Sequence, residues 1–142
     1  MKTILIMLAL GVSTSIASAQ KIKSTEVPAS VTAAFKNKYA SATEVKWKKE
    51  AENFEASFDL AKTDLSVLFN AQGKVLEVEE ELELKQLPSI VLDYVKSKYK
   101  SESIEEAAKI TDSNGVVTYE AEVNDKDLLF DSNGKFIKES KE

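Results

Sequence analysis

The chain carries one sequence pattern twice, about 60 residues apart. In each copy a proline is followed by an aromatic or aliphatic residue, a lysine-rich segment ending in tyrosine, an alternating segment and a Gly-Lys turn. The offset is 60 at the proline and 61 at the closing glycine, so insertions and deletions nearly cancel, as in a duplicated structural unit. The first copy comprises residues 27–31, 35–39, 54–56 and 68–74, and the second comprises residues 87–91, 95–99, 119–121 and 129–135.

The first 19 residues have the layout of a secretory signal peptide. Lys2 supplies the positive start, residues 4–12 form an apolar stretch, and residues 17–19 are the small residues of a cleavage site. The apolar stretch is shorter than the roughly 20 residues needed to span a bilayer. We therefore predict cleavage before Gln20, a periplasmic or secreted location, and no membrane insertion after cleavage.

The rest of the chain, residues 20–142, is predicted to form a single domain made of two repeats, about 27–84 and 87–138. A chain of 60 residues buries only about 60% of its unfolded surface, so the two repeats are expected to fold together. The net charge is −5, or −6 without Lys2, and no basic stripe is present. This composition argues against nucleic acid as a partner.

The residue inventory excludes most common catalytic machinery. The chain contains no histidine and no cysteine, and all of its 19 basic residues are lysines. Thiol nucleophiles, imidazole bases and the usual zinc or copper ligands are therefore absent. We expect no cofactor and no enzyme activity. A hydrolase that uses two carboxylates is the enzymatic alternative that the composition leaves open.

The spacing of apolar residues predicts one helix in each repeat. Positions i, i+3, i+4 and i+8 are apolar or aromatic after Pro28 and again after Pro88, which predicts helices that end near Ala40 and Lys100. Proline suits the first turn of a helix, where no N–H is needed. The tyrosines at the matching helix ends, residues 39 and 99, are expected to be core residues whose hydroxyl groups reach a backbone group.

After each helix the period changes to two, which predicts strands with one buried face and one polar face. Phe54, Ala56 and Phe58 alternate with polar residues, as do Tyr119 and Ala121. Turns are predicted at residues 71–73, 112–115 and 131–134. The fold class is therefore α+β, a tandem duplication of a helix plus a four-stranded antiparallel sheet, with helices on one face and the other face polar.

Acidic side chains on the predicted strands are the candidate partner-binding residues. Trp47, the only tryptophan, is either a partner anchor or a core residue, and the core is favoured. The acidic stretch from Glu77 to Glu83 is either a solvated strand face, which is favoured, or a carboxylate patch for calcium or for a basic partner surface. The candidate face comprises Trp47, Glu55, Asp59, Glu77, Glu79, Glu81, Glu120 and Glu122.

The whole pattern resembles the PepSY-like family of small exported proteins, also called β-lactamase-inhibitor-like. The resemblance lies in residues 27–28, 35–39, 44–47, 54–56, 69, 73–74, 87–88, 99, 119–120 and 130–135. It departs at Ala40 and Lys100, where the family often has proline. The resemblance implies a fold like that of the β-lactamase inhibitor protein, a periplasmic location and no established activity. It transfers no catalytic or inhibitory residue.

These observations predict a non-enzymatic periplasmic module that binds an unidentified protein or peptide through its open sheet face. Inhibition of a peptidase or a β-lactamase is one form that such binding could take. The alternative is a calcium or small-ligand binding protein that uses the acidic sheet face.

Overall fold

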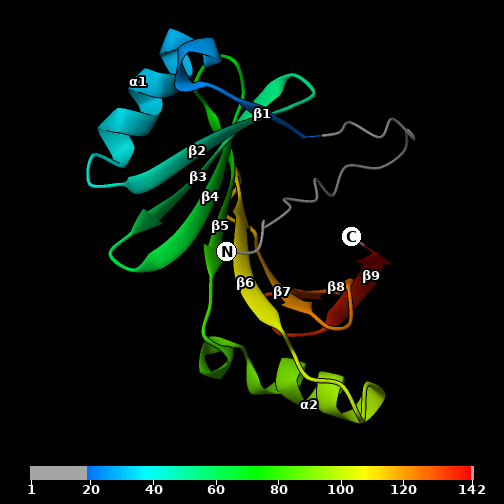
Figure 1. Cartoon of the computed structure of the whole chain (residues 1–142). Coiled ribbons are helices and arrows are strands. Elements are labelled where there is room, and N and C mark those ends of the chain that lie inside the picture. The colour runs from blue at the N-terminus through cyan, green and yellow to red at the C-terminus, as the bar shows by residue number, and fades with distance from the viewer. Residues whose placement is uncertain (1–18, 142) are drawn as a thin grey trace. The chain divides into compact units, whose positions relative to one another are not determined.

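The structure is a computed structural model that describes residues 19–141, so the predicted signal peptide lies outside the described residues except for Ala19. The chain divides into two compact units, unit 1 (Met1–Val78) and unit 2 (Glu79–Glu142). After α1 (Ala29–Lys38) and α2 (Ser89–Lys98) the chain continues in strands, and a short 3-10 turn precedes each helix (Figure 1). The strands are β1 (Gln20–Ile22), β2 (Thr43–Glu50), β3 (Asn53–Leu60), β4 (Thr63–Phe69), β5 (Val75–Glu81), β6 (Glu106–Asp112), β7 (Val117–Glu122), β8 (Lys126–Asp131) and β9 (Phe136–Lys141).

The nine strands follow chain order in one sheet, from β1 to β9. The predicted α+β class with one helix per repeat is confirmed. The predicted unit of four strands in each repeat is not clearly present, because β1 adds a strand at the edge and β5 crosses the boundary between the units. Within residues 19–141, no helix is both long and apolar enough to cross a membrane.

The core of unit 1 lies between α1 and one face of its strands. Phe35 of α1 contacts Trp47 and Phe58 edge to face, with ring centroids 5.3 and 5.0 Å apart. Phe69 is fully buried, and its ring centroid lies 6.5 Å from that of Phe35. Aromatic pairs in this geometry stabilise a core beyond the area that they bury.

Unit 2 repeats this arrangement at equivalent positions. Tyr119 lies opposite Phe130 on β7 and β8, as Phe54 lies opposite Phe69 on β3 and β4. Both helices have ten residues and begin directly after a proline, and their last hydrogen bonds come from Tyr39 and Tyr99.

The turn that closes each repeat is built in the same way. The Asn70 side chain accepts hydrogen bonds from the backbone N–H groups of Gln72 and Lys74, at 3.0 and 2.9 Å. Asp131 accepts the equivalent pair from residues 133 and 135, both at 2.9 Å. Such side-chain turns fix the chain reversal locally. The turn at Asn70 also contacts α1, because the Ser30 hydroxyl donates to the Ala71 carbonyl at 2.7 Å.

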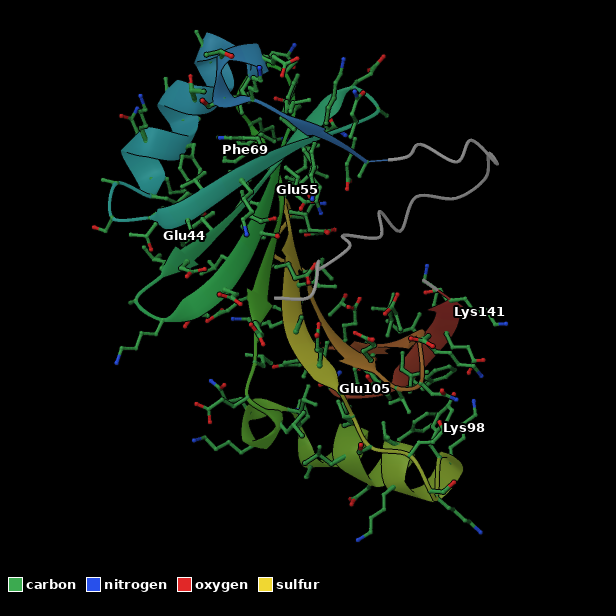
Figure 2. All side chains as sticks on the ribbon, viewed as in Figure 1. Glu44, Glu55, Phe69, Lys98, Glu105 and Lys141 are labelled. Atoms are coloured by element: carbon green, nitrogen blue, oxygen red, sulfur yellow. The ribbon has the colours of Figure 1, made fainter. Side chains whose placement is uncertain are left out.

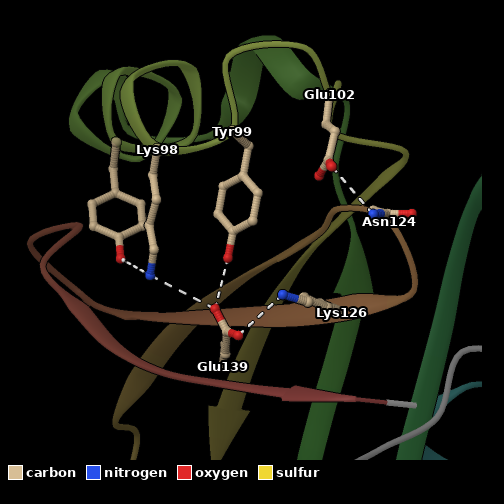
Figure 3. A network of polar contacts seen from close by, with 7 residues as sticks. Lys98, Tyr99, Glu102, Asn124, Lys126 and Glu139 are labelled. Carbon is tan, nitrogen blue, oxygen red and sulfur yellow. Dashed lines mark hydrogen bonds and ion pairs between the residues drawn. The ribbon is translucent and has the colours of Figure 1, made fainter.

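In unit 2, a polar network joins the end of α2 to the last strand (Figure 3). Glu139 on β9 accepts hydrogen bonds from the Tyr99 hydroxyl at 2.7 Å and from Lys126 Nζ at 3.2 Å. Lys98 Nζ lies 3.7 Å from the same carboxylate and 4.9 Å from the centre of the Phe136 ring. The prediction that the Tyr99 hydroxyl reaches a backbone group is therefore wrong, because a carboxylate acceptor is available nearby.

Gly73 allows a test of how closely the turn and α1 pack. Its φ is +84°, and a Cβ added there would lie 2.6 Å from the Ser30 carbonyl oxygen, whereas Gly115 has φ +81° and nothing within 4 Å. We predict that G115A lowers the free energy of unfolding by roughly 1 kcal/mol, the cost of the left-handed backbone, and that G73A lowers it by more. Urea denaturation of both variants measures this, and equal losses would contradict the proposed close packing.

The network around Glu139 predicts a pH dependence. The hydrogen bond from Tyr99, followed by that from Lys126, lowers the pKa of Glu139 in the folded protein. A lowered pKa stabilises the fold above the unfolded pKa, and this contribution is lost as the pH falls through the folded pKa. We predict that E139Q melts at a lower temperature than the wild type at pH 7 and that the difference shrinks as the pH falls below the ordinary pKa of glutamate. A difference in melting temperature between E139Q and the wild type that does not change with pH would contradict this role of Glu139.

Candidate functional site

The face of unit 1 opposite α1 carries polar side chains, and we call it the polar face. Strand register places Lys48 opposite Glu55 and Glu55 opposite Leu68, while Ser57 lies opposite Ser66. Because side chains alternate along a strand, these residues point away from Phe54, Ala56 and the helix-side core.

A chain of hydrogen bonds crosses the polar face from β2 to β4. Glu55 Oε1 accepts from Lys48 Nζ at 3.4 Å and from the Ser57 hydroxyl at 2.9 Å. The Ser57 and Ser66 hydroxyl oxygens are 2.9 Å apart. Ser57 has one hydroxyl proton and gives it to Glu55, so Ser66 is the donor to Ser57. Glu55 is 0% exposed, Ser66 1% and Lys48 8%.

A groove of about 790 Å³ opens among β1, β2, β3 and β4. Ligand pockets in proteins have typical volumes of about 300–1,000 Å³, so the groove is large enough for a ligand. Polar side chains contributed by all four strands line it: Lys21, Glu44, Lys46, Lys48, Ser57, Asp59, Asp64 and Ser66.

One end of the groove is acidic. Asp59 lies directly opposite Asp64, and Glu44 is near enough to repel Asp59. A hydrogen bond that protonated Asp59 donates to Asp64, followed by burial and repulsion, raises the pKa of Asp59. Glu44 stands at an irregularity of β2 with φ +54°, in the left-handed region that non-glycine residues rarely adopt (Figure 2).

A second carboxyl group lies near the hydrogen-bond chain. Glu50 follows Lys48 by two residues on β2 and is partly buried. Burial, a hydrogen bond with Glu55 and repulsion by Glu55 raise the pKa of Glu50 to about 7, while Lys48 acts in the opposite direction.

The structure separates the predicted site residues. Trp47 is 7% exposed and packs in the helix-side core, as favoured from the sequence, although it also borders the groove. Of the predicted carboxylates in unit 1, Asp59 lines the groove, and Glu55 is hydrogen-bonded to Lys48 and Ser57, which line it. Val45, two residues before Trp47, is 37% exposed because the irregularity in β2 breaks the alternation.

The acidic stretch on β5 is not a uniformly solvated face. Glu81 is exposed, Glu77 is partly buried and Glu79 is 0% exposed. The preference for a solvated strand face was therefore wrong for Glu79. In unit 2, Glu120 and Glu122 are both partly buried on β7.

Equivalent positions of the two units carry different polar residues. Ala56 and Ala121 occupy matching places in the register, so the row Lys46–Ser57–Ser66 of unit 1 corresponds to the row Glu106–Glu122–Asp127 of unit 2. Unit 1 thus has an ammonium and two hydroxyls where unit 2 has three carboxyl groups. Among residues 19–141, no group of three or more acidic side chains has an arrangement that could hold a metal ion.

Sequence reasoning missed Lys21, Lys48, Ser66, Asp64 and Glu50 as site residues. The alternation around Trp47 and Phe58 places Lys48 and Ser57 on the polar face, but it does not reveal that β1 pairs with β2 beside them. No motif marks these residues.

Comparison with known proteins identifies the family. The family described as putative beta-lactamase-inhibitor-like, PepSY-like, matches residues 14–77 and 56–138. The chain therefore belongs to this family, which confirms the resemblance. No curated protein matches the chain significantly.

Solved structures share the fold at low sequence identity. A structure described as a putative periplasmic protein from Bacteroides eggerthii has a TM-score of 0.70 and 16% identity, over 81% of this chain and 88% of that one. A BLIP-like protein from Bacteroides fragilis has a TM-score of 0.63 and 24% identity, over 80% of this chain and 86% of that one. These likenesses concern the fold.

The opposed carboxyl groups in the groove yield a stability prediction. A raised pKa of Asp59 means that the folded state binds its proton more tightly, so stability falls as the pH rises from the unfolded pKa through the folded one. We predict that D64N melts at a higher temperature than the wild type at pH 7, with a smaller gain near pH 4 and in high salt. Differential scanning fluorimetry measures the shift, and D93N, at an exposed position of α2, is the control. A D64N protein no more stable than the wild type at pH 7 would contradict the repulsion.

Proposed function

We propose that this chain is a non-enzymatic periplasmic binding protein that holds a protein or peptide segment in the groove of unit 1. The groove, about 790 Å³ and lined by four strands, is the observation that carries the proposal. The absence of histidine, cysteine and arginine from the sequence supports a binding role over catalysis. The descriptions of fold relatives as periplasmic, together with the signal-like first 19 residues, support the location.

The lining of the groove suits a polypeptide. Lysine side chains occur along β1 and β2, and the carboxyl groups of Asp59 and Asp64 lie at the other end, with serine hydroxyls between them. The backbone amide groups of an extended segment can hydrogen-bond to the serine hydroxyls. Its acidic and basic side chains can pair with the lysines and with the aspartates of the groove. Charges arranged in this way give register and specificity more than raw affinity.

The test begins with a displayed library of random peptides selected against the wild-type protein. Peptides that survive selection are titrated by calorimetry against K46E, which reverses a groove charge, and against K138E, the same substitution on β9 of unit 2, outside the groove. We expect at least about a tenfold loss of affinity for K46E, equivalent to about 1.4 kcal/mol, and no loss for K138E.

Two results would contradict the proposal: no saturable peptide, or peptides that bind K46E and the wild type equally. Assays of a β-lactamase and of peptidases with the same proteins test the narrower form of the proposal. Inhibition by the wild type that is lost in K46E would define the groove as an inhibitory surface.

A further inference from the structure

The buried carboxylate of Glu55 has one oxygen that lacks a permanent donor. Its Oε1 accepts from Lys48 and Ser57, but Oε2 is buried and has no hydrogen-bond partner among residues 19–141. A buried carboxylate oxygen without a donor is costly, and such groups in native proteins are nearly always satisfied. A donor that exists only in one protonation state would resolve this.

Glu50 can supply that donor. It shares a face of β2 with Lys48, as residues two apart on a strand do, and Lys48 lies opposite Glu55 in the register. Protonated Glu50 gives an O–H group to Glu55, and deprotonated Glu50 places a second negative charge next to it. Burial and this contact with Glu55 raise the pKa of Glu50 to about 7, in agreement with the geometry.

We propose that Glu50 and Glu55 hold one proton between them, and that its loss near neutral pH changes the floor of the groove through Lys48 and Ser57. With the proton bound, one carboxylate faces one ammonium group, and the local charges balance. Without it, two carboxylates face the same ammonium group. Lys48 is then held more strongly at the carboxylates, and the floor gains one negative charge.

The surrounding groups decide whether the proton stays. Glu77 on β5 repels the pair and favours the proton, while Lys48 opposes it. The neighbours on the adjoining strands are Lys21 on β1 opposite Lys48, Asn53 on β3 opposite Glu50, and Leu68 on β4 opposite Glu55. Of these groups around the pair, Lys48 and Lys21 are cationic and Glu77 is acidic, so three carboxyl groups including the pair share two ammonium groups.

The proton therefore makes the groove responsive to pH. Above neutrality the more negative floor favours a basic segment, and below neutrality it accepts a neutral or acidic one. This consequence for binding rests on the proposed function of the groove, whereas the shared proton does not. A raised carboxyl pKa also means that stability falls as the pH rises between the unfolded pKa of Glu50 and about 7.

The experiment needs no ligand. Carboxyl carbons of glutamate and backbone amides are followed by NMR between pH 5 and 9 in the wild type, in E50Q and in E52Q, a control in the exposed turn after β2. We expect the wild type and E52Q to show a carboxyl titration near pH 7, with matching amide shifts at Lys48, Ser57 and Ser66. In E50Q the side-chain amide that replaces the carboxyl group donates permanently, so the transition at these backbone amides disappears and their shifts stay at the low-pH position.

Melting temperatures over the same range give the second measurement. The wild type should lose stability between pH 5 and 8, and E50Q should lose at least half of that slope. The proposal is overturned if Glu50 titrates near pH 4 in the wild type, or if E50Q keeps the transition near pH 7. If the pH transition is seen but no peptide binds, the shared proton is supported and the proposed function of the groove is contradicted.

Discussion

The packing of one helix against one face of the strands is the constraint on which the rest of each unit depends. In unit 1, the ring of Phe35 contacts the rings of Trp47, Phe58 and Phe69 on the helix side of the strands. Side chains alternate along a strand, so the residues on either side of a core residue point to the other face of the sheet. A difference between the two faces helps to specify the register of a strand, and apart from Leu68 this face carries the serines, lysines and carboxylates from which a binding site can be built.

The two repeats show which face is free to differ. The helix-side pair of aromatic residues occurs in both units, as Phe54 with Phe69 and as Tyr119 with Phe130. The polar row differs completely, with Lys46–Ser57–Ser66 in one unit and Glu106–Glu122–Asp127 in the other. A substitution in the core leaves a cavity or causes strain, whereas a substitution on the polar face changes charge and hydrogen bonding at lower cost. The duplication has thus produced one framework with two different surfaces.

The sequence predicted the elements that depend on local rules. Both helices lie within the predicted ranges, and the turns at Gly73 and Gly134 occur where expected, because helical periodicity and turn residues act over a few positions. The sequence did not predict β1, whose three residues are too few for an alternation to show. It also placed Glu79 on a polar face without predicting that this carboxylate is fully buried. Alternation gives the side of a strand that a residue occupies, while exposure depends on what else packs there.

The buried charged groups of unit 1 lie on the strands that form the groove, and their burial cannot be read from the sequence. Lys48 and Glu55 form a buried ion pair, and such a pair contributes less to stability than well-packed apolar residues would, because both charges lose their hydration. Glu50 adds a second carboxyl group where one lysine already has a partner. An arrangement that costs stability persists where it has another use, and strained or perturbed groups cluster at functional sites. The strands that hold these groups also form walls of the groove, so the cost is concentrated where a ligand would be bound.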